Sequence, residues 1–194
     1  MDLKDVQPYI EGKICMVTGG GGSIGSEIVR SLSKLNAEKI VIVDIYENGA
    51  YSVKCEVGDK VTVEIASVRD YEKMDCIMNK YRPDIVFHAA AHKHVPFMEL
   101  SPEEAVKNNV KGTETVADLA EKYNADNFVL ISTDKAVEPI SVMGASKRCC
   151  EMYVYEKSLK SKHTKFSAVR FGNVLNSNGS VIPLFKKQIE NGVV

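Results

Sequence analysis

The chain has 194 residues, of which 44% are hydrophobic and 26% charged, and its formal net charge is −1 at pH 7. This length is sufficient for one domain with a sizeable core, and neither the near-zero charge nor the scattered lysines would attract nucleic acid or an anionic membrane. No apolar run is long enough to span a bilayer, no segment has signal-peptide features, and the five cysteines lack paired metal spacing, so we expect a cytoplasmic chain with reduced thiols and no membrane contact of its own.

Short apolar runs alternate with helical patterns along the chain. Strands are predicted at Lys13–Thr18, Lys39–Asp44, Val61–Ile65, Pro83–His88, Asn127–Ser132 and Phe166–Phe171, and helices at Ser23–Leu35, Tyr71–Tyr81, Glu103–Tyr123 and Met143–Leu159. Strands rich in valine, isoleucine and leucine that alternate with helices indicate a parallel sheet covered on both faces. The predicted fold class is therefore α/β, a Rossmann-type doubly wound parallel sheet with helices on both faces.

The connection between the second and third strands has two interpretations. About sixteen residues separate these strands, which is close to the minimum for a crossover helix. A short helix over Glu47–Glu56 would keep the strands parallel, whereas the alternation in Val53–Val57 and Val61–Val63 would also suit a β-hairpin. We favour the helix.

A glycine-rich loop joins the first strand to the first helix, and Gly19, Gly22 and Gly25 fit the pattern G-x-x-G-x-x-G. Such glycines allow a tight turn, close backbone approach to a pyrophosphate and close packing of helix on strand, although an isolated loop of this kind is often only a flexible turn. Asp44, at the end of the second strand, favours a dinucleotide site because its carboxylate would bind the adenosine ribose hydroxyls. The same carboxylate would repel a 2′-phosphate, so NAD is expected rather than NADP.

Three histidines, His88, His92 and His94, follow the fourth strand. They lie on a loop rather than on one helical face, and no acidic or cysteine partner lies at ligand spacing, so we expect no metal site. The alanines between them, Ala89–Ala91, would instead let a cofactor lie against the backbone, with the polar groups of the loop near its phosphate or sugar.

The strongest sign of catalysis lies at the carboxyl end of the fifth strand, where Thr133, Asp134 and Lys135 follow an apolar run. Polar groups there are costly unless they act on a ligand, and ligands bind at the carboxyl ends of strands in open parallel sheets. A hydroxyl, an acid and a base, with Lys147 early in the next helix, suit proton transfer at a sugar or alcohol carbon while a cofactor carries hydride. Taken alone, Met143-x-x-x-Lys147 would fit an ordinary amphipathic helix.

A cluster of polar side chains follows the sixth strand in the segment Arg170–Ser180. An ordinary turn would explain its asparagines equally well. Because the segment begins at the carboxyl end of a strand, we favour contact with a substrate, through Asn173 and Ser180.

Together these features resemble an extended short-chain dehydrogenase/reductase, over nearly the whole chain. The resemblance depends on the glycine loop, Asp44, Val68–Asp70, Arg82–Pro96, Asn109–Thr113, Ser132–Ala136 and Arg170–Val174. More narrowly, the motifs A-A-A-H-K-H-V-P and S-T-D-K-A are similar to those of the UDP-N-acetylglucosamine 4,6-dehydratases of bacterial capsule, O-antigen and protein-glycan synthesis. Residues 1–12 resemble the linker of long, membrane-anchored members, which implies that this chain is the cytoplasmic part of an inner-membrane protein.

The resemblance implies a lyase that acts on a UDP-sugar and uses NAD to take hydride from C4 and return it to C6. Lys135 would remove the C5 proton, Asp134 would protonate the departing C6 hydroxyl, and Thr133 would bind the C4 oxygen. Lys147 would hold the nicotinamide ribose. The implied cofactor-binding residues are Gly19, Gly22, Ser23, Ile24, Gly25, Asp44, Val68, Arg69, Asp70, Ala89, Ala90, Ala91, Asn109 and Lys147, and the implied substrate-binding residues are His92, Lys93, Asn173 and Ser180.

The chain departs from the superfamily in two ways. Met143 stands at the catalytic position where most members have tyrosine, as it does in the long members, and a thioether cannot act as a base. The base for C4 oxidation is therefore open between Asp134 and Lys135. Residues 13–194 would form the NAD-binding Rossmann domain and the start of the substrate-binding region, without the C-terminal substrate lobe of roughly 100 residues that follows in the family. Such a chain could bind NAD without turning over a substrate.

Two other functions remain possible from the sequence. A nucleotide-sugar 4-epimerase would return the hydride to C4, although Lys135 after Asp134 and the methionine at position 143 argue against it. A non-catalytic NAD-binding regulatory domain would suit a chain that lacks a substrate lobe. For either enzyme the expected partners are a UDP-sugar and further copies of the chain in a homo-oligomer.

Overall fold

The computed structural model describes residues 5–174 and 188–191. These residues contain a six-stranded sheet in the order β3-β2-β1-β4-β5-β6, and every pair of neighbouring strands is parallel. The strands are β1 (Ile14–Thr18), β2 (Lys39–Asp44), β3 (Val61–Ile65), β4 (Ile85–His88), β5 (Asn127–Ile131) and β6 (Lys165–Val169). The predicted α/β, Rossmann-type fold is confirmed, and the direction in which strands are added reverses between β1 and β4.

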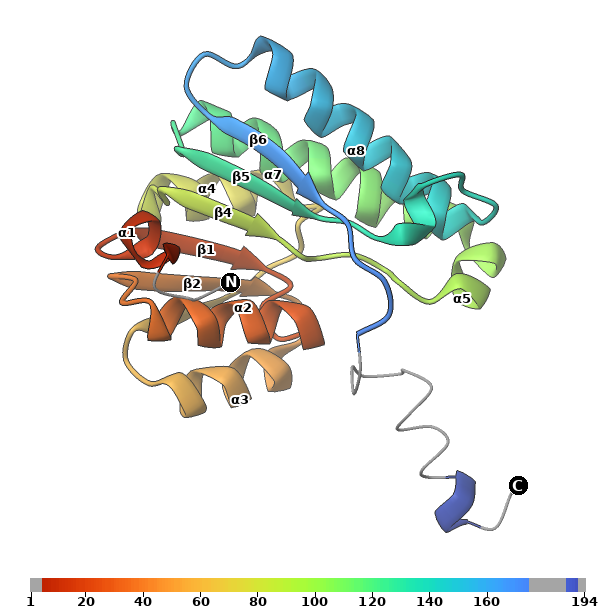
Figure 1. Ribbon diagram of the computed structural model, residues 1–194, viewed down its shortest axis with the longest axis horizontal. Coiled ribbons are helices and arrows are strands. Elements are labelled where there is room, and N and C mark those ends of the chain that lie inside the picture. Colours follow the sequence, from red (N-terminus) through yellow and green to blue (C-terminus); the bar gives the residue numbers. More distant parts are fainter. Residues whose placement is uncertain (1–4, 175–187, 192–194) are drawn as a thin grey trace.

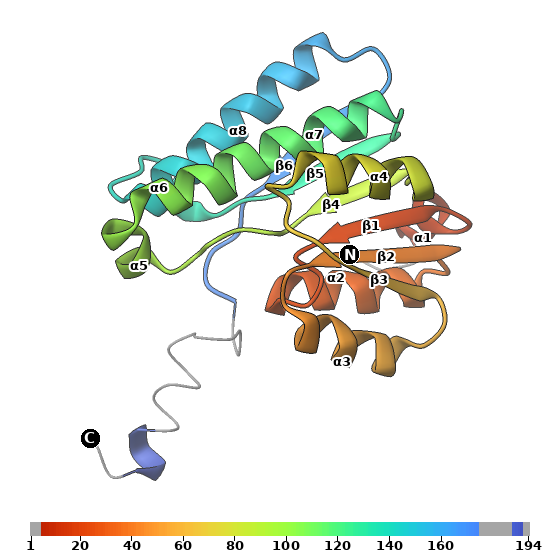
Figure 2. The same ribbon diagram turned by 180° about the vertical axis from the view of Figure 1, so that it is seen from behind.

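Helices cover both faces of this sheet (Figure 1). On one face lie α2 (Ser23–Lys34) and α3 (Glu47–Val57), and on the other lie α4 (Tyr71–Tyr81), α7 (Gly112–Lys122) and α8 (Val142–Lys160), as Figure 2 shows from behind. The side chains of β1 alternate between two hydrophobic cores: Met16 packs in the core under α4, α7 and α8, whereas Cys15 and Val17 pack in the core under α2 and α3. This two-sided burial explains why the strands have continuous apolar sequences.

The segment between β2 and β3 is a helix, as predicted, and not half of a hairpin. It forms α3, which buries Ala50 and Val53 against the sheet, and β3 runs parallel to β2. The helix ends at Gly58, which has a positive φ of 91°.

The long helix predicted over 103–123 differs in detail from the structure. It is built from α6 (Pro102–Ala105), a π-helical turn η2 (Val106–Lys111) and α7. A π-helical turn holds one more residue than an α-helical turn and is often found at functional sites. Here it buries the side chains of Asn108 and Asn109. A short helix that the sequence pattern did not predict, α5 (Val95–Leu100), precedes this segment.

The N-terminal segment, expected to resemble a linker, contains the one-turn helix α1 (Gln7–Ile10). Ile10 is buried in the core under α2 and α3, and the backbone N–H of Gly12 donates to the carbonyl of Asn36. The division at residue 12 stays a prediction. Within the described residues, no helix is both long and apolar enough to cross a membrane.

Candidate functional site

The glycine loop meets the segment after β4 at the carboxyl end of the sheet. Gly19 has φ of +71°, and a Cβ at this position would lie 2.7 Å from the backbone nitrogen of Ala90. A Cβ on Gly25 would lie 2.1 Å from the carbonyl oxygen of Gly19. Both positions therefore require glycine, because no side chain fits between the two backbones. Gly22, in contrast, has an ordinary extended backbone, and its Cβ would meet only the Gly19 oxygen, at 3.3 Å.

Asp44, at the end of β2, holds this loop in place. One oxygen of its carboxylate, Oδ2, accepts a hydrogen bond from the backbone N–H of Gly21 at 2.8 Å, and Oδ1 accepts one from the N–H of Tyr46 at 2.9 Å. The carboxylate thus stands beside the loop at the start of α2. The free N–H groups of a helix start attract phosphate, and a nearby carboxylate suits ribose hydroxyls.

A cleft of about 180 Å³ lies at the carboxyl ends of β1, β2, β3 and β4. It is lined by eight residues that the sequence predicted as part of a site, namely Gly19, Gly22, Asp44, Val68, Ala89, Ala90, Ala91 and His92, and by six that it did not, namely Val43, Ile45, Tyr46, Ala66, Ser67 and Asn108. Most of the missed residues follow β2 and β3. Their position at the carboxyl ends of these strands is the signal that could have identified them.

Other predicted cofactor residues have structural partners. Arg69 pairs with Glu104 at 2.6 Å, and the side chain of Asp70 caps the start of α4 by accepting from the N–H of Lys73. Ser23 and Ile24 form the first turn of α2 next to the glycine loop. Their roles toward a cofactor stay predictions.

Thr133, Asp134 and Lys135 gather at the carboxyl end of β5, where residues 134–136 form the 3₁₀ turn η3. The carboxylate oxygen Oδ1 of Asp134 accepts from the Thr133 hydroxyl at 2.9 Å and from the Lys135 ammonium at 3.2 Å. The same ammonium donates to Oδ1 of Asn173, which follows β6, at 3.3 Å. Hydrogen bonds from Thr133 and Lys135 lower the pKa of Asp134. The carboxylate and the ammonium are thus in direct contact, and both side chains are exposed.

The helix α8 packs closely against this cluster. A Cβ on Gly144 would lie 2.4 Å from the carbonyl oxygen of Lys135, so the first turn of α8 touches the backbone of η3. Met143, the residue before it, is buried and packs with Met98 and Ala105. Its side chain thus belongs to a small apolar cluster under α5 and α6.

Lys147, one turn further along α8, is only 5% exposed. Burial lowers the pKa of its ammonium, which the negative charges of Cys150 and Glu151 would raise. Burial of an ammonium is costly, and a buried lysine with a shifted pKa at this edge of the sheet is a candidate functional residue.

A buried polar network joins the strands to these helices. The hydroxyl of Thr113 donates its single proton to the carbonyl of Asn109, so toward His88 it can only accept, from Nε2 at 3.0 Å. Since Nε2 then carries the proton of the neutral imidazole, Nδ1 of His88 accepts from the hydroxyl of Thr18 at 2.7 Å. Complete burial, with a smaller effect of the Lys147 charge, lowers the pKa of His88 to about 3. The imidazole is therefore neutral and serves as a hydrogen-bonding bridge between β1 and α7.

The π-helical turn adds a second bridge. The amide of Asn109 donates to Oγ of Ser146 on α8 at 2.9 Å and to the carbonyl of His92 at 3.1 Å, and its oxygen accepts from the N–H of His92 at 2.8 Å. Asn109, predicted as a cofactor residue, thus holds the loop that lines the cleft. The sequence did not predict the parts of Thr18, Thr113 and Ser146 in these networks.

The last of the three predicted histidines, His94, lies at the start of a short helix. His94 precedes α5 and stacks edge-on against Phe97, with ring centroids 5.9 Å apart. In the described part of the chain, no three histidine, cysteine or acidic side chains are grouped as a metal site would require. Lys93 lies between His92 and His94, and Ser180 lies outside the described residues.

The chain is similar to several known proteins. It is 51% identical to the probable polysaccharide biosynthesis protein EpsC of Bacillus subtilis, over 99% of this chain and 33% of that protein. It is 35% identical to a UDP-N-acetylglucosamine 4,6-dehydratase (inverting) of Campylobacter jejuni, over 93% of this chain and 55% of the enzyme. It is also 40% identical to a UDP-glucose 4-epimerase of Rickettsia canadensis, over 93% of this chain and 54% of the epimerase.

Among solved structures, Pen from Bacillus thuringiensis matches with a TM-score of 0.88 and 33% identity, over 94% of this chain and 58% of that protein. The chain thus spans between a third and about three fifths of these relatives. The family model described as polysaccharide biosynthesis protein matches residues 15–194. The fold, the glycine loop and the Thr133-Asp134-Lys135 cluster lie within the matched residues. The chain belongs to this polysaccharide biosynthesis protein family, within the extended short-chain dehydrogenase/reductase superfamily.

Proposed function

We propose that the chain is the NAD-binding catalytic part of a nucleotide-sugar 4,6-dehydratase that acts on a UDP-N-acetylhexosamine such as UDP-N-acetylglucosamine. The contact between Asp134 and Lys135, at 3.2 Å and at the carboxyl end of β5, is the observation that carries this proposal. Elimination of water needs a base and an acid close together, whereas hydride transfer alone needs neither at this spacing. The similarity to the Campylobacter dehydratase supports the same reaction.

The residues present fit NAD. The cofactor would accept hydride from C4 of the sugar and return it later to C6, and the proton of the C4 hydroxyl would leave to solvent. Gly19 and Gly22 would let the backbone approach its pyrophosphate, and Asp44 would bind its adenosine ribose and disfavour NADP. Lys147, which is buried on the first turns of α8, would donate to the nicotinamide ribose.

The pair of Asp134 and Lys135 would carry the proton transfers. Elimination requires an uncharged lysine to remove the C5 proton and a protonated aspartic acid to donate to the departing C6 hydroxyl. Before a substrate binds, the site is open to water, and the lowered pKa of Asp134 keeps its carboxylate charged and bonded to the Lys135 ammonium. Moving one proton across this 3.2 Å contact gives the reactive forms without any change in total charge. Enclosure by substrate would favour this transfer, because desolvation disfavours the charged forms.

The second candidate function is a nucleotide-sugar 4-epimerase, which the similarity to the Rickettsia epimerase supports. An epimerase oxidises C4 and returns hydride to C4, so it needs no base at C5 and no acid at C6. The position of Lys135, in contact with both Asp134 and Asn173, favours the dehydratase.

Mass spectrometry tests the proposal and separates the candidates. The gene product that contains this chain would be incubated with UDP-N-acetylglucosamine. A product lighter by one water molecule is expected; a product of unchanged mass that migrates as the 4-epimer would support the epimerase. If NAD binds and the sugar is unaltered across a panel of UDP-sugars, a non-catalytic NAD-binding domain is the better interpretation.

The assignment of acid and base is tested in heavy water. We expect Lys135→Met to stop both water loss and deuterium incorporation at C5. We expect Asp134→Asn to slow water loss by about 100-fold or more while deuterium still enters C5. Deuterium at C5 in the lysine variant, and none in the asparagine variant, would reverse the two roles.

A further inference from the structure

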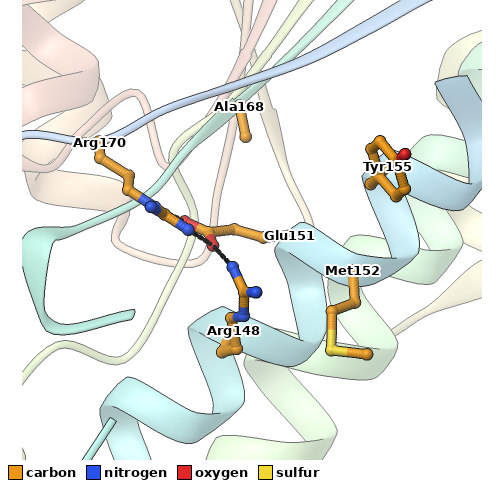
Figure 3. A pocket seen from close by; sticks show the side chains of 6 residues that line it. All are labelled: Arg148, Glu151, Met152, Tyr155, Ala168 and Arg170. Atoms are coloured by element: carbon orange, nitrogen blue, oxygen red, sulfur yellow. Dashed lines mark hydrogen bonds and ion pairs between the residues drawn. The ribbon is translucent and has the colours of Figure 1, made fainter. Parts of the chain in front are cut away.

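A second buried charge on α8, Glu151, lies one turn after Lys147, and its side chain is only 7% exposed (Figure 3). Its Oε1 accepts from the hydroxyl of Ser132 at 2.6 Å and from Nε of Arg170 at 2.8 Å. Its Oε2 accepts from Nη2 of Arg170 at 2.6 Å and from Nη1 of Arg148 at 3.3 Å. Burial would raise the pKa of Glu151, but the bonds from Arg170 and Ser132 outweigh it and lower the pKa, so the carboxylate is charged at neutral pH.

These bonds connect three elements at the candidate site. Ser132 follows β5 and directly precedes Thr133, and Arg170 follows β6. The backbone N–H of Ser132 donates to the carbonyl of Val169 at 2.8 Å, and that of Asp134 donates to the carbonyl of Phe171 at 3.1 Å. The pairing of β5 and β6 therefore continues past both strands, as far as the segment that carries Thr133, Asp134 and Lys135. The Glu151 carboxylate is hydrogen-bonded to both sides of this extension, to Ser132 after β5 and to Arg170 after β6.

A contribution to stability alone does not explain the arrangement. The ion pairs of Glu151 add little net stability, because desolvation of the buried carboxylate offsets its attraction to the exposed arginines. The site is also loosely packed on one side, where a cavity of about 540 Å³ between α8 and β6 is lined by Met152, Tyr155 and Ala168 as well as by the charged residues (Figure 3). The hydrogen bonds, rather than close packing, hold the carboxylate in one position.

We propose that Glu151 is a positioning residue that fixes the segment carrying Thr133, Asp134 and Lys135 relative to Lys147 on α8. This inference rests on the proposed roles of the acid–base pair and of Lys147 toward NAD. Glu151 itself touches neither pair member. It acts through the end of β5 on one side and through its own helix on the other.

The test compares Glu151→Gln with Glu156→Gln. Glutamine keeps the volume of Glu151 but replaces one acceptor oxygen with a donor that faces Arg170. Glu156 lies on the same helix, is exposed and pairs only with nearby lysines, so its variant removes the same charge without touching the site. For Glu151→Gln we expect kcat to fall by about tenfold or more at saturating NAD, with the KM for the UDP-sugar changed by less than about threefold. We expect Glu156→Gln to behave as the unmodified protein.

A second measurement needs no turnover. The affinity for NAD is measured by calorimetry for Glu151→Gln, Lys147→Met and the double variant. If Glu151 acts by placing Lys147, Glu151→Gln weakens NAD binding by about tenfold alone and has no further effect in the Lys147→Met background. A loss of equal size in both backgrounds, or the same result for Glu151→Gln and Glu156→Gln, would overturn the inference and indicate general destabilisation or no role.

This design separates the inference from the proposed function. If the unmodified protein binds NAD but dehydrates no sugar, the dehydratase proposal fails. The NAD affinities of the two single variants and the double variant still test the role of Glu151 in that case. If Glu151→Gln does not fold, Ser132→Ala removes the link to β5 alone, with Ser158→Ala on the exposed side of α8 as its control. Ser132→Ala is expected to lower kcat in the same direction, and an unchanged kcat would contradict the proposal.

Discussion

At the scale of single residues, the glycines of the loop after β1 have separable roles. A methyl group at Gly22 would need only a small shift, since its Cβ would lie 3.3 Å from the Gly19 oxygen, whereas at Gly25 the distance would be 2.1 Å and no methyl group fits. We therefore expect Gly22→Ala to fold normally and to weaken NAD binding by at least about tenfold, because the methyl group would face the pyrophosphate. Gly25→Ala should lower the free energy of unfolding by roughly 1–3 kcal/mol or more, as overpacking does.

Thermal unfolding and calorimetric titration check this pair of variants. An unchanged midpoint for Gly22→Ala establishes that its loss of binding is local. If Gly22→Ala bound NAD as tightly as the unmodified chain, the pyrophosphate would not lie on this loop.

Met143 is the residue at which the sequence departs most from its superfamily, and its position in the core gives a clear prediction. It is 4% exposed and packs with Met98 and Ala105. Met143→Leu nearly preserves volume and polarity, so the cost in stability should be below about 1.5 kcal/mol and dehydratase activity should largely remain. Steady-state kinetics provide the check, with Met143→Ala as a cavity control that should cost about 2–5 kcal/mol. A loss of about 100-fold for the leucine variant would mean that the thioether takes part in the chemistry.

At the scale of elements, the apolar runs were sufficient to predict the six strands of the described residues. Two-sided burial accounts for the apolar sequences of β1, β2 and β4, whereas β3, β5 and β6 are less buried. The apolar runs could not predict the π-helical turn at 106–111. The repeat of apolar residues continues through it, and only the contacts of Asn109 with His92 and Ser146 show why an extra residue is inserted. The sequence also predicted Asp134 and Lys135 at the carboxyl end of β5, where the structure has them, but it did not predict the link from this segment to Glu151. That link joins residues on three elements, and glutamate on a helix has no distinguishing pattern.

The contact between the edge strand β3 and α4 is electrostatic and should respond to pH. Glu64 on β3 accepts from Lys80 at 2.8 Å and from the hydroxyl of Tyr81 at 2.7 Å, and these bonds lower its pKa. Because the pKa is lower in the folded state, the stabilisation is complete above the unfolded pKa of about 4.3 and is lost as the pH falls through the folded value. Glu64→Gln should therefore cost about 1–2 kcal/mol at pH 7 and progressively less in acid.

Urea denaturation at pH 7 and at several acidic pH values measures this difference. Glu27→Gln is the matched control, because Glu27 pairs with Arg30 but is 71% exposed, and its cost should stay within about 0.5 kcal/mol. A cost at Glu64 that did not shrink in acid would show that packing, and not charge, holds β3 to α4.

At the scale of the whole molecule, the two halves of the sheet are covered unequally. On the side of α4, α7 and α8, Phe128 and Leu130 of β5 are fully buried, whereas the side chains that alternate with them are only partly buried. In β6 only Phe166 is buried, and Val169 is 47% exposed. Among the described residues, β6 pairs with β5 alone and so presents an edge of unpaired backbone groups.

This asymmetry predicts a gradient of local stability across the sheet. Amide protons of β1, which pairs with strands on both sides and is buried on both faces, should exchange only through global unfolding. Those of β6 should exchange through a smaller opening, with a free energy lower by several kcal/mol. Hydrogen exchange followed by mass spectrometry compares peptides that cover β1, β6 and the opposite edge strand β3. Protection of β6 equal to that of β1 would contradict the prediction, and would mean that its face and edge are covered in solution.

Protection between these values is expected for β3, because α3 packs against it. The least stable edge of the sheet would then be the one that carries Arg170 and Asn173, so Glu151 would hold the acid–base segment on the side of the molecule that opens most easily.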